Sequence, residues 1–260
     1  MNDLLAGVCG LQQCDDHRLA ADLATAAGRV LRALRQAFRL GPGTLGDAGD
    51  ATADALIRTI LAQVRPADAF LSEHDAQDAT RLTSERVWII DPLDGTREYS
   101  EAAAKRTDWA VHVALTRGGR PLAAAVALPA LDVTLSTASP PTLPPCPSGR
   151  VKILVSRTRP PAVAESVAAA LDAELVPMGS AGAKAAAVVR GQAHAYLHAG
   201  GQYEWDSCAP VGVALAAGLH ASRIDGSPCV YNRADVRMPD LLVCRPELAG
   251  RLLAAIAACS

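Results

Sequence analysis

The sequence lacks the features of several broad protein classes. It has 25 Lys and Arg against 27 Asp and Glu, a net charge of −2, so it has no basic excess with which to bind the phosphate backbone of a nucleic acid. No apolar run approaches the roughly 18 residues that would span a membrane. Half of the residues are apolar and a fifth are charged, which is typical of a globular chain. We therefore expect a soluble globular protein whose partners are neither nucleic acids nor membranes.

Signals for cysteine pairing and export are also missing. The seven cysteines are scattered and include no C-x-x-C pair, which argues against a disulfide framework or a zinc site. No basic region precedes the apolar residues at the start, and Val8 is bulky for a lipoprotein cleavage site before Cys9. We predict a cytoplasmic protein with reduced cysteines.

The first sixty residues carry a helical pattern. Apolar side chains recur every three or four positions from Leu19 to Phe38, which predicts an amphipathic helix, and Gly41-Pro42-Gly43 is expected to end it. A second helix is predicted over residues 56–64, ending just before Pro66.

The period then changes to that of strands. Short apolar runs at 69–72 and 87–90 predict buried strands. Alternation over 109–115 and 122–128, around a glycine pair, predicts an antiparallel hairpin. Residues 1–138 are therefore predicted to form a helix pair on an antiparallel sheet.

A proline-rich segment separates this half from the rest. Residues 139–149 contain five prolines and cannot continue a helix or strand, so we predict a linker. Strands and helices alternate over residues 150–260, which favours a mixed or parallel sheet covered by helices. The expected strands are 151–155, 175–178, 193–198, 221–224 and 241–244, and the expected helices are 161–172, 183–189, 205–217 and one from Pro246.

The segment Trp88–Thr96 carries the most chemical information. A buried strand leads into a turn that presents Asp91, the Leu93 carbonyl and Asp94 within four residues. Carboxylate and carbonyl oxygens are the ligands that Mg²⁺ prefers. Taken alone, the segment could also be an ordinary Asp-Pro and Asp-Gly turn with solvated acids.

Neighbouring groups add to this segment. The amides of Gly95 and Thr96, at the expected start of a helix, suit a phosphate. Glu73 follows the preceding strand, and Asp206 lies in the first turn of a later helix. Each of these acids alone could be a surface acid or a helix N-terminal acid.

Together, Ser72-Glu73, Trp88–Thr96 and Trp205-Asp206 resemble the motifs of the inositol monophosphatase superfamily of Mg²⁺-dependent, lithium-sensitive phosphatases. The resemblance covers nearly the whole chain. It implies an α/β fold, with an α+β N-terminal half, built as a layered α-β-α-β-α sandwich. It also suggests a homodimer.

The resemblance implies roles for individual residues. Thr96 and Glu73 would orient the attacking water, and Asp94 would complete the catalytic set. Two or three Mg²⁺ ions would be held by Glu73, Asp91, the Leu93 carbonyl, Asp94, Asp206 and, for an additional ion, Asp50. The implied substrate-binding residues are Leu93, Asp94, Gly95, Thr96, Ser180, Lys184 and Asp206.

Two departures from the family pattern bear on the metal site. His74 stands where the family often has a second glutamate, and the usual lysine upstream of Asp50 is absent. We expect His74 to tune the site.

Two segments resemble the 3′(2′),5′-bisphosphate nucleotidase branch, and a third could contact its substrate. Gly179–Lys184 is similar to its segment before the last aspartate, and Lys184 would provide a cation for a second phosphate. Residues 225–232 also look like this branch. Ser156–Arg159 could contact a nucleotide, with a solvated basic turn as the alternative.

This branch implies hydrolysis of the 3′-phosphate of 3′-phosphoadenosine 5′-phosphate, or of its sulfated parent, in sulfur assimilation. One alternative is an inositol 1-phosphate or fructose 1,6-bisphosphate phosphatase with the same metal site. A second alternative is a non-catalytic protein that binds a phosphorylated metabolite.

Other signals are weaker. The G-x-G-x-x-G pattern at 41–46 follows a helix instead of a strand, which argues against a dinucleotide site. His194 and His198 lie in an expected strand and are interpreted as packing residues. Asp75 and Asp78 are interpreted as a solvated acidic edge.

Overall fold

The structure is a computed structural model that describes residues 10, 12–37, 41–74, 78–101 and 104–259. Cys9, Phe38 and Asp75, for which the sequence makes predictions, lie outside the described residues.

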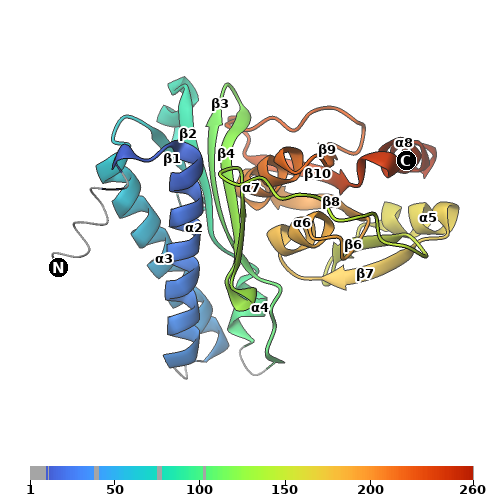
Figure 1. Cartoon of the computed structure of the whole chain (residues 1–260), viewed down its shortest axis with the longest axis horizontal. Helices are drawn as coiled ribbons and strands as arrows, with labels where there is room; N and C mark the ends of the chain where they lie inside the picture. Colours follow the sequence, from blue (N-terminus) through green and yellow to red (C-terminus); the bar gives the residue numbers. More distant parts are fainter. Residues whose placement is uncertain (1–9, 11, 38–40, 75–77, 102–103, 260) are drawn as a thin grey trace.

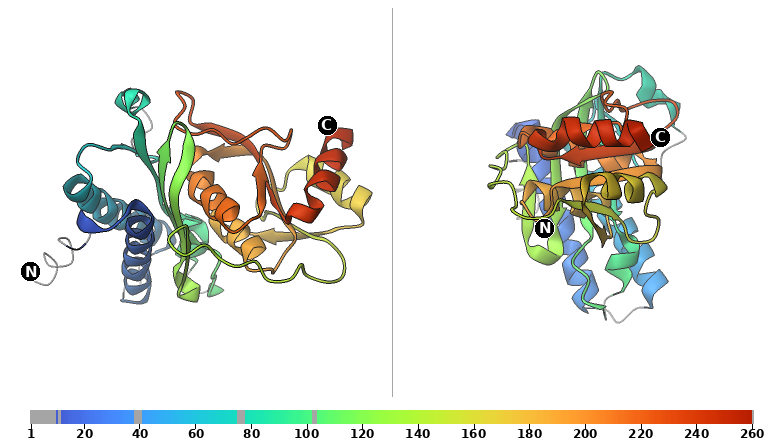
Figure 2. Two further views of the ribbon diagram at one scale, coloured as in Figure 1. Left: turned by 45° about the horizontal axis from the view of Figure 1, so that its top comes forward. Right: turned by 90° about the vertical axis from the view of Figure 1, so that its right-hand side faces the viewer.

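Helices and sheets alternate in five layers (Figure 1). Helices α2 (Asp16–Ala37) and α3 (Pro42–Val64) cover the outer face of the first sheet. Helices α6 (Ala181–Val189) and α7 (Glu204–Ala216) lie between the two sheets. The outer face of the second sheet is covered by α5 (Ala162–Leu171) and α8 (Ala249–Cys259), at the opposite end of the molecule (Figure 2). The α-β-α-β-α sandwich expected from the sequence is confirmed.

The first sheet has the order β1-β2-β3-β4-β5. Its strands are β1 (Ala69–Leu71), β2 (Arg86–Asp94), β3 (Ala110–Arg117), β4 (Arg120–Leu128) and β5 (Val133–Ser136). The β3–β4 hairpin turns at Gly118 and Gly119, whose φ values of 58° and 73° suit glycine. The predicted antiparallel arrangement describes strands β2 to β5, whereas β1, at the edge of the sheet, pairs with β2 in parallel.

The second sheet has the order β7-β6-β8-β10-β9. Its strands are β6 (Lys152–Ser156), β7 (Glu174–Met178), β8 (Ala195–Tyr203), β9 (His220–Ser222) and β10 (Arg237–Cys244). Strand β6 is parallel to β7 and β8, whereas β10 is antiparallel to β8 and β9. The predicted mixed sheet covered by helices is confirmed.

Helix α3 begins at Pro42, well before the predicted start at residue 56. Its early part contains Gly46 and Gly49, which lower intrinsic helix propensity. A Cβ at Gly46 would lie 2.6 Å from Ser100 Oγ, and one at Gly49 would lie 2.7 Å from the Tyr99 ring. Close packing of α3 on α4 (Thr96–Ser100) therefore outweighs the weak propensity and places Asp50 beside the candidate site.

The two halves share one apolar core. Ile89 and Val126 of the first sheet are buried in the same cluster as Val188 of α6, Val211 of α7 and Leu241 of β10. The proline-rich residues 139–149 form neither helix nor strand and connect β5 to β6. Among the helices described, none combines the length and apolar character needed to cross a membrane.

Candidate active site

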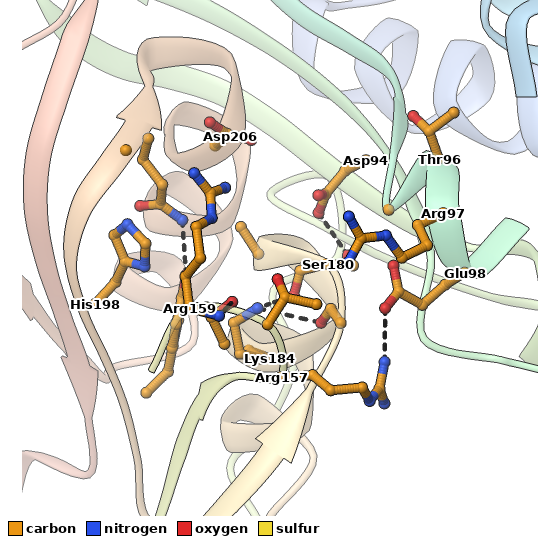
Figure 3. A pocket seen from close by; sticks show the side chains of 18 residues that line it. Asp94, Thr96, Arg97, Glu98, Arg157, Arg159, Ser180, Lys184, His198 and Asp206 are labelled. Carbon is orange, nitrogen blue, oxygen red and sulfur yellow. Dashed lines mark hydrogen bonds and ion pairs between the residues drawn. The ribbon is translucent and has the colours of Figure 1, made fainter. Parts of the chain in front are cut away.

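Three carboxylates converge between the two halves of the molecule. Asp91 and Asp94 lie on β2, and Asp206 lies in the first turn of α7. Their ligand atoms are all within 4.8 Å of one another. Asp94 and Asp206 line one cavity between the two halves and reach it from different elements (Figure 3).

The burial and close approach of these carboxylates disfavour their ionised forms. Burial raises the pKa of Asp91 well above its ordinary value, and the neighbouring carboxylates raise it further. Burial and Asp94 together raise the pKa of Asp206 to about 7. Hard oxygen donors that repel one another in a buried position match the ligand set of a divalent cation, which would relieve the repulsion.

Asp94 differs from its neighbours because donors surround it. Its Oδ2 atom accepts hydrogen bonds from Ser180 Oγ at 2.5 Å and from the Gly182 amide at 2.7 Å. Burial alone would raise its pKa, yet His112, the Ser180 hydroxyl and Lys184 lower it to about 2. Asp94 is therefore held in the ionised form that a metal ligand needs.

The sequence analysis missed His112, which lies on β3 and is fully buried. Its Nδ1 lies 3.0 Å from the Trp205 carbonyl, and its Nε2 lies 3.1 Å from Asp94 Oδ2. Because a carbonyl only accepts, Nδ1 must carry a proton. The ring thus connects β2, β3 and α7. The only sequence signal was a polar residue inside an apolar strand.

A second acidic group lies nearby. Ligand atoms of Asp50, Glu73 and His74 are within 4.8 Å of one another, and His74 Nε2 is 2.7 Å from Asp50 Oδ2. Within the described structure, Asp50 Oδ1 is buried without a partner. Partial burial, together with Asp50, raises the pKa of Glu73. An imidazole nitrogen therefore lies where the family resemblance leads one to expect a carboxylate.

The predicted catalytic residues line one cavity of about 210 Å³. Gly95 has a φ of 84° and begins α4, and Thr96 Oγ1 donates a hydrogen bond to the Leu93 carbonyl at 3.0 Å. The cavity includes Glu73, Asp91, Leu93, Asp94, Gly95, Thr96, Arg159 and Asp206.

Ser180 and Lys184 line an adjoining cavity of about 230 Å³, but their polar groups are engaged. Lys184 is 4% exposed, and its ammonium donates to the Ser180 and Gly179 carbonyls at 2.7 and 3.2 Å. The ammonium also lies 4.9 Å from the centre of the Tyr196 ring. Burial lowers the pKa of Lys184 to about 8. Direct contact of Lys184 with a phosphate would have to replace these carbonyl contacts.

Arg97 and Arg159 are exposed cations that line this second cavity, and of the two it is Arg159 that also lines the first. Its neighbour Arg157 forms ion pairs with Glu98 and Asp108 at 2.6 and 2.5 Å. In contrast, the Arg159 guanidinium has no hydrogen-bond or ion-pair partner in the described part of the chain. Arg159 lines both cavities and faces Asp206 across them (Figure 3).

Comparison with known proteins agrees with this geometry. The inositol monophosphatase family model matches residues 18–260. The chain belongs to the inositol monophosphatase family. Family members are metal-dependent phosphatases, and the resemblance predicted from the sequence is confirmed.

The names of individual relatives in this family specify a substrate. The 3′-phosphoadenosine 5′-phosphate phosphatase of Mycobacterium tuberculosis is 53% identical over 244 residues, covering 89% of this chain and 89% of the relative. The 3′(2′),5′-bisphosphate nucleotidase CysQ of Escherichia coli strain K12 is 32% identical over 197 residues, covering 71% and 78%. The solved inositol monophosphatase of Anabaena shares the fold with a TM-score of 0.71 at 21% identity, covering 93% of this chain and 94% of that one.

Proposed function

We propose that this protein is a Mg²⁺-dependent phosphatase that removes the 3′-phosphate from 3′-phosphoadenosine 5′-phosphate. The observation that carries the proposal is the position of Arg159, an unpaired cation between the acidic cavity and a second cavity. A substrate with two phosphates can place one at the acidic cavity and the other at Arg159. The identity to 3′-phosphoadenosine 5′-phosphate phosphatases supports the same substrate.

The residues present fit a divalent cation. Asp91, Asp94, Asp206 and the Leu93 carbonyl would hold the principal ions, and Asp50 with Glu73 would hold a further one. Bound Mg²⁺ would supply Lewis-acid stabilisation of the phosphoryl group and activation of water. The unfavourable grouping of buried carboxylates supports this assignment.

Thr96 and Glu73 would orient the attacking water. The Thr96 hydroxyl donates its proton to the Leu93 carbonyl, so towards the cavity it can only accept a hydrogen bond. Glu73 lines the same cavity and has a raised pKa, which suits a proton acceptor. A water that donates one hydrogen to each side chain would have its lone pair directed away from both.

The two phosphates would be bound by different elements. The Gly95 and Thr96 amides, at the start of α4, would bind the phosphate that is cleaved. Arg159 would pair with the other phosphate. Lys184 and Ser180 would support the site indirectly. Lys184 would contribute its positive charge, and Ser180 would hold Asp94 through the hydrogen bond that it donates.

A phosphate-release panel tests the proposal. We expect the adenosine bisphosphate to be hydrolysed in preference to inositol 1-phosphate and fructose 1,6-bisphosphate, with adenosine 5′-phosphate as the product and with loss of activity in EDTA. Preference for inositol 1-phosphate would overturn the substrate assignment. Binding of the nucleotide without phosphate release at any Mg²⁺ concentration would indicate a non-catalytic binding protein.

The proposed reaction belongs to sulfur assimilation, where this by-product is cleared, and the sulfated parent nucleotide offers the same 3′-phosphate. The cytoplasmic location and the homodimer expected from the sequence stay predictions.

A further inference from the structure

The wall of the second cavity carries buried polar atoms that have no partner. His198 is 4% exposed, and in the described structure neither of its ring nitrogens makes a hydrogen bond of regular geometry. Gln202 is 7% exposed, and its Oε1 is likewise unpaired. Both side chains line the cavity that Arg159 also lines, and Figure 3 shows His198 and Arg159 there. Because unpaired buried polar groups are costly, their concentration on one wall indicates a bound group that pairs with them.

The local backbone brings these side chains together. Tyr196 and His198 lie two residues apart on β8, on the same face. Gly200 and Gly201 then adopt φ values of 86° and 76°, and the pairing of β8 with β10 shifts register across them. Gln202 consequently returns to that face and donates from Nε2 to the Tyr196 hydroxyl at 2.7 Å, which leaves its Oε1 as an acceptor.

A second buried histidine provides a contrast. Nδ1 of His194 accepts from the Lys152 amide at 3.0 Å, and its Nε2 is 3.0 Å from the Pro147 carbonyl. The packing role predicted for both histidines therefore describes His194. His198 has the same burial without such partners.

The imidazole of His198 is neutral near pH 7. Burial and the charge of Lys184 lower the pKa of His198 to about 4, against a weaker opposing effect of the Gly200 backbone. A neutral imidazole offers one N–H donor and one bare nitrogen. Together with Gln202 Oε1, the wall carries a donor and an acceptor, and the Arg159 guanidinium lies close by, against Gly201.

We propose that His198 and Gln202 bind the amino edge of the adenine base, an inference that rests on the function proposed above. Adenine carries an exocyclic amino donor beside a ring-nitrogen acceptor. The amino group would donate to Gln202 Oε1, and the ring nitrogen would accept from His198. Hypoxanthine has a carbonyl in place of the amino group. Its oxygen would face Gln202 Oε1, and two acceptors cannot form a hydrogen bond with each other.

The test compares kcat/KM for the 3′,5′-bisphosphates of adenosine and inosine. We expect the wild-type protein to favour the adenosine substrate by about 10- to 100-fold, since two hydrogen bonds are at stake. In His198→Ala and Gln202→Leu this ratio should fall towards one. His220→Ala, which alters a half-buried histidine on β9 outside the cavity, should keep the wild-type ratio.

The outcomes separate the two proposals. Hydrolysis of both nucleotides at equal kcat/KM, or a ratio that survives in Gln202→Leu, would overturn base recognition and leave the phosphatase assignment intact. Failure of the wild-type protein to hydrolyse either nucleotide would overturn the proposed function itself. The wild-type ratio needs no variant, so the test does not depend on the folding of His198→Ala.

Discussion

At the scale of single residues, Asp94 has the clearest combination of contacts. Its Oδ2 atom receives hydrogen bonds from the Ser180 hydroxyl and the Gly182 amide, and its pKa is about 2. These donors fix one carboxylate oxygen and leave the other for a cation. Fixed outer contacts of this kind hold a ligand in the geometry that a metal needs.

Asp94→Asn should abolish metal-dependent turnover while the protein still folds. An asparagine can present its oxygen to the Gly182 amide, but its uncharged amide group would then face the cation. We expect kcat/KM to fall at least about 100-fold. The increase in thermal midpoint on adding Mg²⁺ should also be lost, because that increase measures binding to the folded state. Near-normal turnover at millimolar Mg²⁺ would remove Asp94 from the metal site.

Arg159→Ala tests which cation contacts the second phosphate. A charge-assisted hydrogen bond contributes about 1.5–3 kcal/mol, which corresponds to about one to two powers of ten in kcat/KM. The ratio of kcat/KM for the adenosine bisphosphate to that for adenosine 3′-phosphate should fall by this factor. Arg150→Ala, which removes an exposed pair with Asp172, is the matched control. An unchanged ratio in Arg159→Ala would remove Arg159 from this role and leave Lys184 and Arg97, which line the same cavity, as the candidates.

At the scale of elements, α6 positions the site through Gly182. A Cβ at Gly182 would overlap the ring of His112, so the glycine lets α6 approach β3 closely enough for its amide to reach Asp94. Gly182→Ala should lower the free energy of unfolding by about 1–3 kcal/mol, the cost of overpacking, and should also lower kcat. Gly250→Ala on α8 has open space around it and should raise stability by about 0.5–1 kcal/mol. Chemical denaturation of both variants checks this contrast, and equal stability of the two would contradict it.

The sequence predicted those elements whose signals are local, and it missed those that depend on packing between elements. The strand and turn of Trp88–Thr96 were recognised because the apolar run and the motif are local. The early start of α3 was missed because Gly46 and Gly49 favour a helix only when α4 packs against them. The burial of Lys184 was missed for a similar reason: a lysine looks the same in sequence whether its ammonium faces a ligand or the carbonyls of residues 179 and 180.

The unpaired wall formed by His198 and Gln202 was beyond sequence reasoning altogether. The glycine pair at residues 200 and 201 changes the strand register, and only that change brings Gln202 beside Tyr196. The family motifs located the metal chemistry, whereas substrate contacts depended on pairings between elements distant in the chain.

At the scale of the whole molecule, the acidic cluster links stability to pH. The folded pKa of Asp206 is raised to about 7 and that of Asp91 is raised well above its ordinary value. The folded state therefore binds more protons than the unfolded state, and stability is lost as pH rises through the folded pKa. Without metal, the thermal midpoint should fall by several degrees between pH 6.5 and 8.

Saturating Mg²⁺ should flatten or reverse this fall, because the ion takes the place of the protons. His198, whose folded pKa is lowered to about 4, opposes this fall only weakly, because an unfolded histidine loses the last half of its protons above about pH 6.5. Thermal scans with EDTA and with Mg²⁺ at each pH provide the measurement. A metal-free midpoint that rises from pH 6.5 to 8 would contradict the charge repulsion inferred for the cluster.

The division of the carboxylates between the two halves has a consequence for synthesis. A ribosome that has released residues up to 138 has already exposed Asp50, Glu73, Asp91 and Asp94, but Asp206 and the donors of α6 are still to be made. The emerging chain therefore holds a cluster of acids that lacks its closing ligand and the apolar partners of β2 and β4. Under the proposed function, a divalent cation would meet its full set of ligands only after α7 docks, so hydrolytic competence should appear in one late step, once almost the entire polypeptide has left the exit tunnel.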